Sequence, residues 1–144
     1  MSYKSLSLFA DLSRRELQVL QGALHLREYL PGEVIFDEGD KGSALYIVRT
    51  GSVLICRQGR PDDPIATLGA GSFFGELALL DSAPRAAQAR ALELSTLEVF
   101  FGSDFISLLE TETRLSTKIL LQLSRHLGQR LRGTLLGQST EQHL

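Results

Sequence analysis

The chain has 144 residues, a net charge of −2, 43% hydrophobic residues and 22% charged residues. This length fits one domain with a sizeable core, and the composition is that of a soluble globular protein. The slightly negative charge argues against a free-standing nucleic-acid binder, which normally carries a basic face. A single cysteine, Cys56, excludes an intramolecular disulfide and a zinc site made of several cysteines.

The first segment lacks the features of a targeting or membrane segment. Residues 1–16 contain no long apolar region of the kind found in signal peptides. No run along the chain approaches the roughly 20 apolar residues that a membrane-spanning helix needs. We therefore expect a cytoplasmic protein with no direct membrane insertion.

The first helix is predicted by its capping pattern. Ser13 and Glu16 have the spacing of a capping box, and Leu12 and Leu17 occupy the flanking staple positions. From about residue 24 the pattern changes to short β-branched and aromatic runs between turn residues, which are typical of strands. These runs are residues 34–36, 44–48, 52–56 and 65–68, with a late strand in 92–101. They predict a mainly β fold with flanking helices, built as a small antiparallel β-roll or jelly-roll barrel.

After Gly102 the period returns to that of helices. Ser103 and Asp104 can begin one helix, and a longer helix is predicted over about 113–132, with Gly133 and Gly137 as plausible stops. Its apolar residues recur every four positions: Leu115, Ile119, Leu123, Leu127 and Leu131. The domain is therefore predicted to span 1–134, with the barrel at about 24–101, the C-terminal helices at about 103–132, and a disordered tail at 135–144.

The stretch from Phe73 to Ala87 raises the functional question. Between Ile65 and Ala89 the only charged residues are Glu76, Asp81 and Arg85. Residues 76–80 have the composition of one short helix, and a turn at 81–84 would bring Arg85 back toward the start of that helix. An arginine fork beside free main-chain amides suits a phosphate, and a glutamate suits a hydroxyl. The alternative is an ordinary buried salt bridge between Glu76 and Arg85.

Residues 74–80 read FGELALL and residues 84–87 read PRAA. Together they closely resemble the phosphate-binding cassette of the cyclic nucleotide-binding domain family. Residues 31–33, 38–40, 45–48 and Gly51 resemble the family's earlier strand and turn positions. The resemblance covers roughly residues 8–132.

The resemblance implies a 3′,5′-cyclic mononucleotide as ligand. Arg85 would pair with the cyclic phosphate, together with amides around residues 75–78 and 86–87, and Glu76 would accept the ribose 2′-hydroxyl. The implied site residues are Phe74, Gly75, Glu76, Leu77, Ala78, Arg85, Ala86 and Ala87. In the family, a Thr or Ser after the arginine often supports cGMP, so Ala86 favours cAMP. Gln88 replaces the Thr or Ser that is more usual there, with no assigned role. The family's base cap comes from the last helix, where the candidates are Arg125, His126, Gln129 and Arg130.

The leading hypothesis is a cAMP-preferring regulatory module, not an enzyme, that couples ligand binding to movement of its C-terminal helices. No cofactor and no metal are expected. One alternative is a fragment of a larger cAMP-responsive transcription regulator, channel or transporter. Others are a cupin-type metalloenzyme, which the scattered histidines at positions 25, 126 and 143 disfavour, and a scaffold without ligand. A homodimer through the last helix also stays open, because Leu120, Leu123 and Leu127 fit heptad positions but Arg130 interrupts them.

Overall fold

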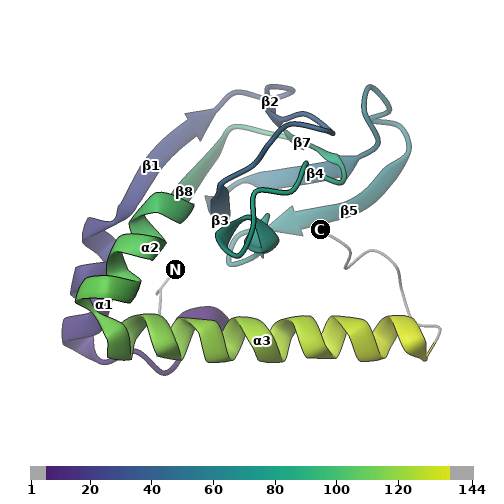
Figure 1. The fold of residues 1–144 in the computed structure, drawn as a ribbon. Helices are drawn as coiled ribbons and strands as arrows, with labels where there is room; N and C mark the ends of the chain where they lie inside the picture. Colours follow the sequence, from purple (N-terminus) through teal and green to yellow (C-terminus); the bar gives the residue numbers. More distant parts are fainter. Residues whose placement is uncertain (1–5, 137–144) are drawn as a thin grey trace.

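The computed structural model describes residues 6–136 (Figure 1). The predicted tail at 135–144 therefore falls mostly outside the described residues. Within them, the elements in chain order are η2 (Ser7–Phe9), α1 (Arg14–Gly22), β1 (Leu24–Tyr29), β2 (Val34–Phe36), β3 (Ala44–Thr50), β4 (Ser52–Cys56), β5 (Pro64–Gly69), β6 (Phe73–Phe74), η3 (Glu76–Leu79), β7 (Gln88–Ala91), β8 (Ser95–Phe101), α2 (Gly102–Thr111) and α3 (Thr113–Leu135).

The strands form two antiparallel sheets, in the orders β1-β8-β3-β6 and β2-β7-β4-β5. The mainly β fold with flanking helices is confirmed, but the described strands make an open roll of two sheets and not a closed barrel. Figure 1 shows the roll above α3, with α1 and α2 at one end of it. The cassette segment η3 lies between the roll and α3, so residues from both can reach the site.

Two hydrophobic clusters hold this arrangement together. One lies between the two sheets and includes Val53, Ile55, Phe74 and Leu97. The other joins the β1-β8-β3-β6 sheet to the helices, and its fully buried members include Leu20, Phe100, Phe105 and Ile119. Burying such side chains is the main force that stabilises a fold of this size. The second cluster anchors the N-terminal half of α3 against the roll.

The predicted capping box at the start of α1 is confirmed. The Ser13 hydroxyl accepts a hydrogen bond from the Glu16 amide, and the Glu16 carboxylate accepts one from the Ser13 amide. Glu16 also accepts a hydrogen bond from Lys118 of α3 at 2.7 Å. A local sequence signal therefore takes part in fastening two helices that lie far apart in the chain.

The long helix differs from its prediction at the C-terminal end. It continues through Gly133 to Leu135, so a stop at Gly133 is wrong, and the other predicted stop, Gly137, lies outside the described residues. Leu115, Ile119 and Leu123 are buried, whereas Leu131 is 61% exposed. A four-residue spacing in a helix of 3.6 residues per turn advances by about 40° at each step, so the stripe rotates away from the core.

Three strands escaped the sequence prediction: β1, β6 and β7. Strand β7 contains Gln88, Ala89, Arg90 and Ala91, which have weak strand preference, yet it pairs with both β2 and β4. The late strand begins at Ser95, since Leu92 lies in the preceding turn and its amide donates to the Ser52 carbonyl at 3.0 Å. Pairing with distant strands, and not local composition, therefore decides whether these segments form strands.

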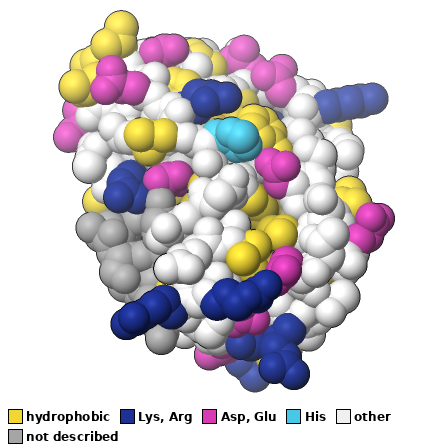
Figure 2. Space-filling model, turned by 90° about the vertical axis from the view of Figure 1, so that its left-hand side faces the viewer, with side chains coloured by type: hydrophobic (Ala, Val, Ile, Leu, Met, Phe, Trp, Pro, Cys, Tyr) yellow, Lys and Arg dark blue, Asp and Glu magenta, His cyan; other side chains and the backbone are white. Residues whose placement is uncertain are grey.

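No helix in residues 6–136 is long and apolar enough to cross a bilayer. Figure 2 shows the face at the left of Figure 1, where basic, acidic and hydrophobic side chains are interspersed. Several of the Lys and Arg side chains lie along the lower edge of this face in Figure 2, with acidic side chains among them.

Candidate ligand-binding site

The cassette begins at Gly75, between β6 and η3. Gly75 has a φ of +74°, a left-handed conformation that other residues adopt only with strain. A Cβ atom there would also lie 2.5 Å from Nη1 of Arg85. The Ala78 amide donates to the Gly75 carbonyl at 3.1 Å, so this predicted anion donor is already bonded within the turn. The short helix is confirmed as one 3₁₀ turn.

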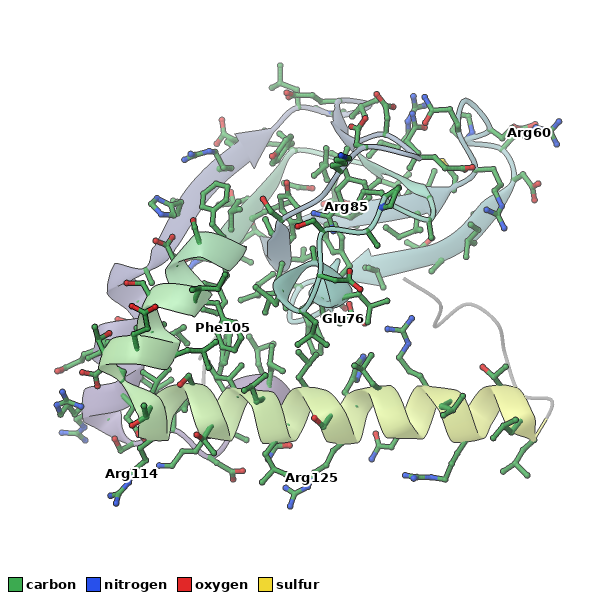
Figure 3. All side chains as sticks on the ribbon, in the orientation of Figure 1. Arg60, Glu76, Arg85, Phe105, Arg114 and Arg125 are labelled. Atoms are coloured by element: carbon green, nitrogen blue, oxygen red, sulfur yellow. The ribbon has the colours of Figure 1, made fainter. Side chains whose placement is uncertain are left out.

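The Arg85 side chain points into the roll from the segment that leads to β7 (Figure 3). Its Nη2 donates to the Ala44 carbonyl at 2.8 Å and its Nη1 donates to the Gly75 carbonyl at 3.4 Å. Its Nε is buried without a hydrogen-bond partner. Its guanidinium carbon lies 4.3 Å from the centre of the Phe36 ring. Within residues 6–136, no carboxylate forms an ion pair with Arg85.

Burial dominates the electrostatics of this arginine. Burial lowers the pKa of Arg85 from its ordinary value, although the neighbouring Asp40 and Glu76 charges act in the opposite direction. Burial also raises the pKa of the nearby Tyr46 phenol. A half-buried cation with only carbonyl and aromatic partners favours the arrival of an anion, because an anion would restore the charge balance lost on burial.

Two pockets share Arg85 as a wall. The inner pocket has a free volume of about 30 Å³ and is lined by Phe36, Ile55, Phe74, Gly75, Arg85, Ala86 and Ala87. The outer pocket has a free volume of about 90 Å³ and is lined by Gly75, Leu77, Ala78, Asp81, Ala83, Pro84, Arg85 and Ala86. The structure thus brings seven of the eight predicted site residues to these pockets, Leu77 and Ala78 to the outer one only. Glu76 lines neither.

Glu76 is turned toward α3 instead. Its side chain is 2% exposed, and its Oε1 accepts a hydrogen bond from Nη1 of Arg130. Nε2 of His126 lies 3.5 Å from the same oxygen. The alternative of a salt bridge between Glu76 and Arg85 is therefore wrong for this structure. The buried ion pair that exists joins the cassette to the long helix.

The four candidates for a base cap separate into two pairs. Arg125 points away from the roll in Figure 3, and Gln129 is exposed. His126 and Arg130 face the cassette, and the His126 ring also packs on Phe73 with centres 5.0 Å apart. The spacing of four residues between His126 and Arg130 puts both on one helix face, which is the only sequence signal that could have selected them.

Sequence reasoning missed several residues that shape the inner pocket. Phe36 lies under the guanidinium, Tyr46 stacks on Phe74 with ring centres 5.3 Å apart, and Ile55 completes the apolar wall. The absence of a side chain at Gly42 also makes room for Arg85, since a Cβ atom there would overlap the guanidinium. Phe36, Tyr46 and Ile55 lie on three different strands and Gly42 lies in the loop before β3, so no local motif groups them. In residues 6–136 no three His, Cys, Asp or Glu side chains gather as a metal-binding group.

The cyclic nucleotide-binding domain profile matches residues 26–112, which include η3, both pockets and Arg85. The chain belongs to the cyclic nucleotide-binding domain family. It is 34% identical over 126 residues to the cyclic AMP receptor protein of Thermus thermophilus, which covers 86% of this chain and 58% of that protein. It therefore spans little more than half the length of that relative.

Solved structures of the family share this fold. The N-terminal domain of a transcriptional regulator from Streptomyces coelicolor superposes with a TM-score of 0.81 and 28% identity, covering 91% of this chain and 93% of that one. The regulatory domain of a Toxoplasma gondii cAMP-dependent kinase, crystallised with cAMP, gives a TM-score of 0.64 and 28% identity over 72% of this chain and 40% of that one. The open roll with flanking helices is thus the family's architecture.

Proposed function

We propose that this chain is a cAMP-preferring receptor module that transmits ligand binding to its C-terminal helices. The observation that carries the proposal is the environment of Arg85. This arginine lines both pockets, contacts only carbonyl and aromatic groups, and keeps a buried Nε without partner. A cyclic phosphate would supply the missing negative charge, and a fork of donors matches its oxygens.

Ligand preference is argued from the residue that follows the arginine. Ala86 lines both pockets and offers no hydroxyl to a guanine amino group. The family resemblance links such a hydroxyl to cGMP binding, so its absence favours cAMP. The Toxoplasma gondii regulatory domain that shares the fold was crystallised with cAMP. We therefore expect cAMP to bind more tightly than cGMP.

The route to the helices runs through Glu76. The family resemblance implies that this carboxylate accepts a hydrogen bond from the ribose 2′-hydroxyl. In the structure it accepts a hydrogen bond from Arg130 of α3. A ribose that bonds Glu76 would change the partner of a buried guanidinium on α3. Ligand binding shifts the helix only if it favours one of the two arrangements over the other.

Calorimetric titration with cAMP and cGMP in parallel tests the receptor function. We expect micromolar or tighter cAMP binding and weaker cGMP binding. Arg85→Ala should weaken cAMP binding by about 2–5 kcal/mol, which is roughly 30-fold to several thousand-fold. A matched control is Arg60→Ala, because Arg60 lies on the far hairpin in Figure 3. Unchanged cAMP affinity in a folded Arg85→Ala protein would refute the assignment.

Hydrogen exchange with and without saturating cAMP tests the coupling. We expect altered exchange in α2 and α3 in the wild-type chain, and a smaller change in Arg130→Ala. If hydrogen exchange at residues 103–132 is the same in the free and the cAMP-bound chain, the coupling to the helices is refuted, while the receptor function is not.

The wider context is a further part of the proposal. We propose that the chain acts as the cytoplasmic sensor part of a larger regulator; the support for the larger regulator is that the match spans 58% of the Thermus thermophilus receptor's length. A homodimer through α3 would use different residues from those expected, because Leu123 is buried and Leu120 and Leu127 pack against the chain's own core. The exposed leucines of the described part of α3 that could take part in pairing are Leu121, Leu131 and Leu135. Sedimentation of the wild type and of Leu131→Glu would test it.

A further inference from the structure

The turn formed by residues 37–41 holds the main chain of Arg85. The Arg85 amide donates to the Asp40 carbonyl at 2.7 Å, and the Gly39 amide donates to the Arg85 carbonyl at 2.8 Å. Lys41 and Pro84 form an isolated antiparallel bridge beside them. The position of the arginine therefore depends on the position of this turn.

The turn itself is poorly anchored by packing. Glu38, Gly39 and Asp40 are all exposed, so few apolar contacts fix them. Segments of this kind open easily unless hydrogen bonds hold them to the scaffold. Hydrogen bonds must therefore hold the turn to the roll.

Glu38 contributes two of these hydrogen bonds, since its amide donates to Oε1 of Gln58 at 2.9 Å and its Oε1 accepts from the Gln58 amide at 3.3 Å. The Asp37 side chain contributes two more. Its Oδ1 accepts a hydrogen bond from Nε2 of Gln88 at 2.8 Å and another from Nε2 of Gln58 at 2.9 Å. Gln88 belongs to β7, and Gln58 belongs to the hairpin between β4 and β5. One carboxylate oxygen thus ties the turn to two neighbouring parts of the same sheet, and these donors hold the pKa of Asp37 below its ordinary value.

Gln88 is oriented for this purpose by its own surroundings. Gln88 is 3% exposed, and its side-chain Oε1 accepts a hydrogen bond from the Cys56 thiol at 3.6 Å. With the oxygen directed at Cys56, the amide NH₂ group is directed at Asp37. A buried amide with both ends bonded is a rigid support, because rotating it would leave polar groups without partners.

Asp37 also follows Phe36, whose ring lies beneath the guanidinium. Phe36 pairs with Ala89 of β7 next to an irregularity in the β2–β7 register. Fastening Asp37 to Gln88 therefore fixes the end of β2 as well as the turn. The same carboxylate therefore helps to hold both the main chain and the aromatic support of Arg85, beside the Glu38–Gln58 hydrogen bonds.

We propose that Asp37 is a positioning residue for the anion site, holding Arg85 in place through its hydrogen bonds to Gln58 and Gln88. This inference rests on the proposed function, since Arg85 has a ligand to receive only in a receptor. It gives Gln88, which had no assigned role, a specific one. We expect the acceptor oxygen of Asp37 to matter more than its negative charge, because both donors to Oδ1 are neutral amides.

Three variants and one control test whether the hydrogen bonds of Asp37 or its negative charge hold Arg85 in place. Asp37→Asn keeps the Oδ1 acceptor and removes the charge, Asp37→Ala removes both, and Gln88→Leu removes the buried donor. Glu93→Ala is the matched control, because Glu93 accepts an exposed hydrogen bond from Ser52 at 3.1 Å and lines neither pocket.

The readouts are cAMP affinity by calorimetry and exchange of the Arg85 and Gly39 amides by NMR. We expect Asp37→Asn to stay within about twofold of wild-type affinity, and Asp37→Ala and Gln88→Leu to weaken binding by about tenfold. Amide exchange at Arg85 and Gly39 should accelerate by about tenfold in the same two variants and stay unchanged in Glu93→Ala. In an Arg85→Lys background, Asp37→Ala should cost much less affinity, because the two residues act as one unit.

Each outcome separates the two proposals. Equal affinity losses in Asp37→Asn and Asp37→Ala would overturn the positioning role, since charge alone would then explain them. Unchanged Arg85 exchange in Asp37→Ala would overturn it even if no ligand bound. A wild-type chain that binds no cAMP, with Arg85→Ala equally inactive, would instead overturn the proposed function.

Discussion

Replacing Arg130 by alanine tests whether the contact between α3 and the cassette stabilises the fold. The Arg130 side chain is 9% exposed and the Glu76 side chain is 2% exposed, so the variant leaves a buried carboxylate with only His126 beside it. Removing one partner of a buried ion pair costs about 3–5 kcal/mol, because the remaining charge is left without compensation. His126 offsets part of this, so we expect a loss of about 3 kcal/mol.

Urea denaturation followed by circular dichroism measures this loss, and thermal denaturation should show a fall in Tm of about 6–12 °C. Arg125→Ala is the matched control, since Arg125 lies on the same helix and points away from the roll in Figure 3. The double variant Arg130→Met with Glu76→Gln should recover most of the stability, because it removes both charges. A loss below about 1 kcal/mol, or one equal to that of Arg125→Ala, would refute the reasoning.

Two further predictions concern the turn glycine and the helix contact. Gly75→Ala should cost about 1–2 kcal/mol of stability and at least about tenfold in cAMP affinity, because a Cβ there meets both strain and Arg85. Gly59→Ala, with φ +69° in open space, should show the strain in denaturation without the affinity loss in calorimetry. The hydrogen bond from Lys118 lowers the pKa of Glu16 below its ordinary value of 4.5, so this carboxylate stabilises the fold above that pH and the contribution disappears as pH falls through the folded pKa. Lys118→Met should therefore lose less stability than wild type between about pH 5 and pH 3 in denaturation curves; an identical pH profile would contradict this.

Local signals in the sequence were sufficient for the helix start and for the cassette. The capping box of Ser13 and Glu16 acts over four residues, so its chemistry is complete within the segment that carries it. The cassette is likewise one continuous stretch, and seven of its eight predicted residues line the two pockets. Strands with β-branched and aromatic residues between turns were also predictable, since their composition differs from that of their surroundings.

The sequence could not decide contacts that depend on distant segments. Strand β7 has a composition unfavourable to strands and exists because β2 and β4 pair with it on both sides. Helix α3 continues through Gly133, where its local sequence predicted a stop. The four-residue spacing did not show which of its apolar residues are buried. Packing against the roll buries Leu115, Ile119 and Leu123.

The chain by itself determined that a carboxylate and a guanidinium lie nine positions apart beside a glycine turn, and that this pattern suits a phosphate and a hydroxyl. Only the tertiary structure decided that Glu76 faces Arg130 while Arg85 faces two pockets. The physical reason is that a buried charge takes the nearest partner that can compensate it, and proximity between residues 76 and 130 is created by the fold, not by the local sequence.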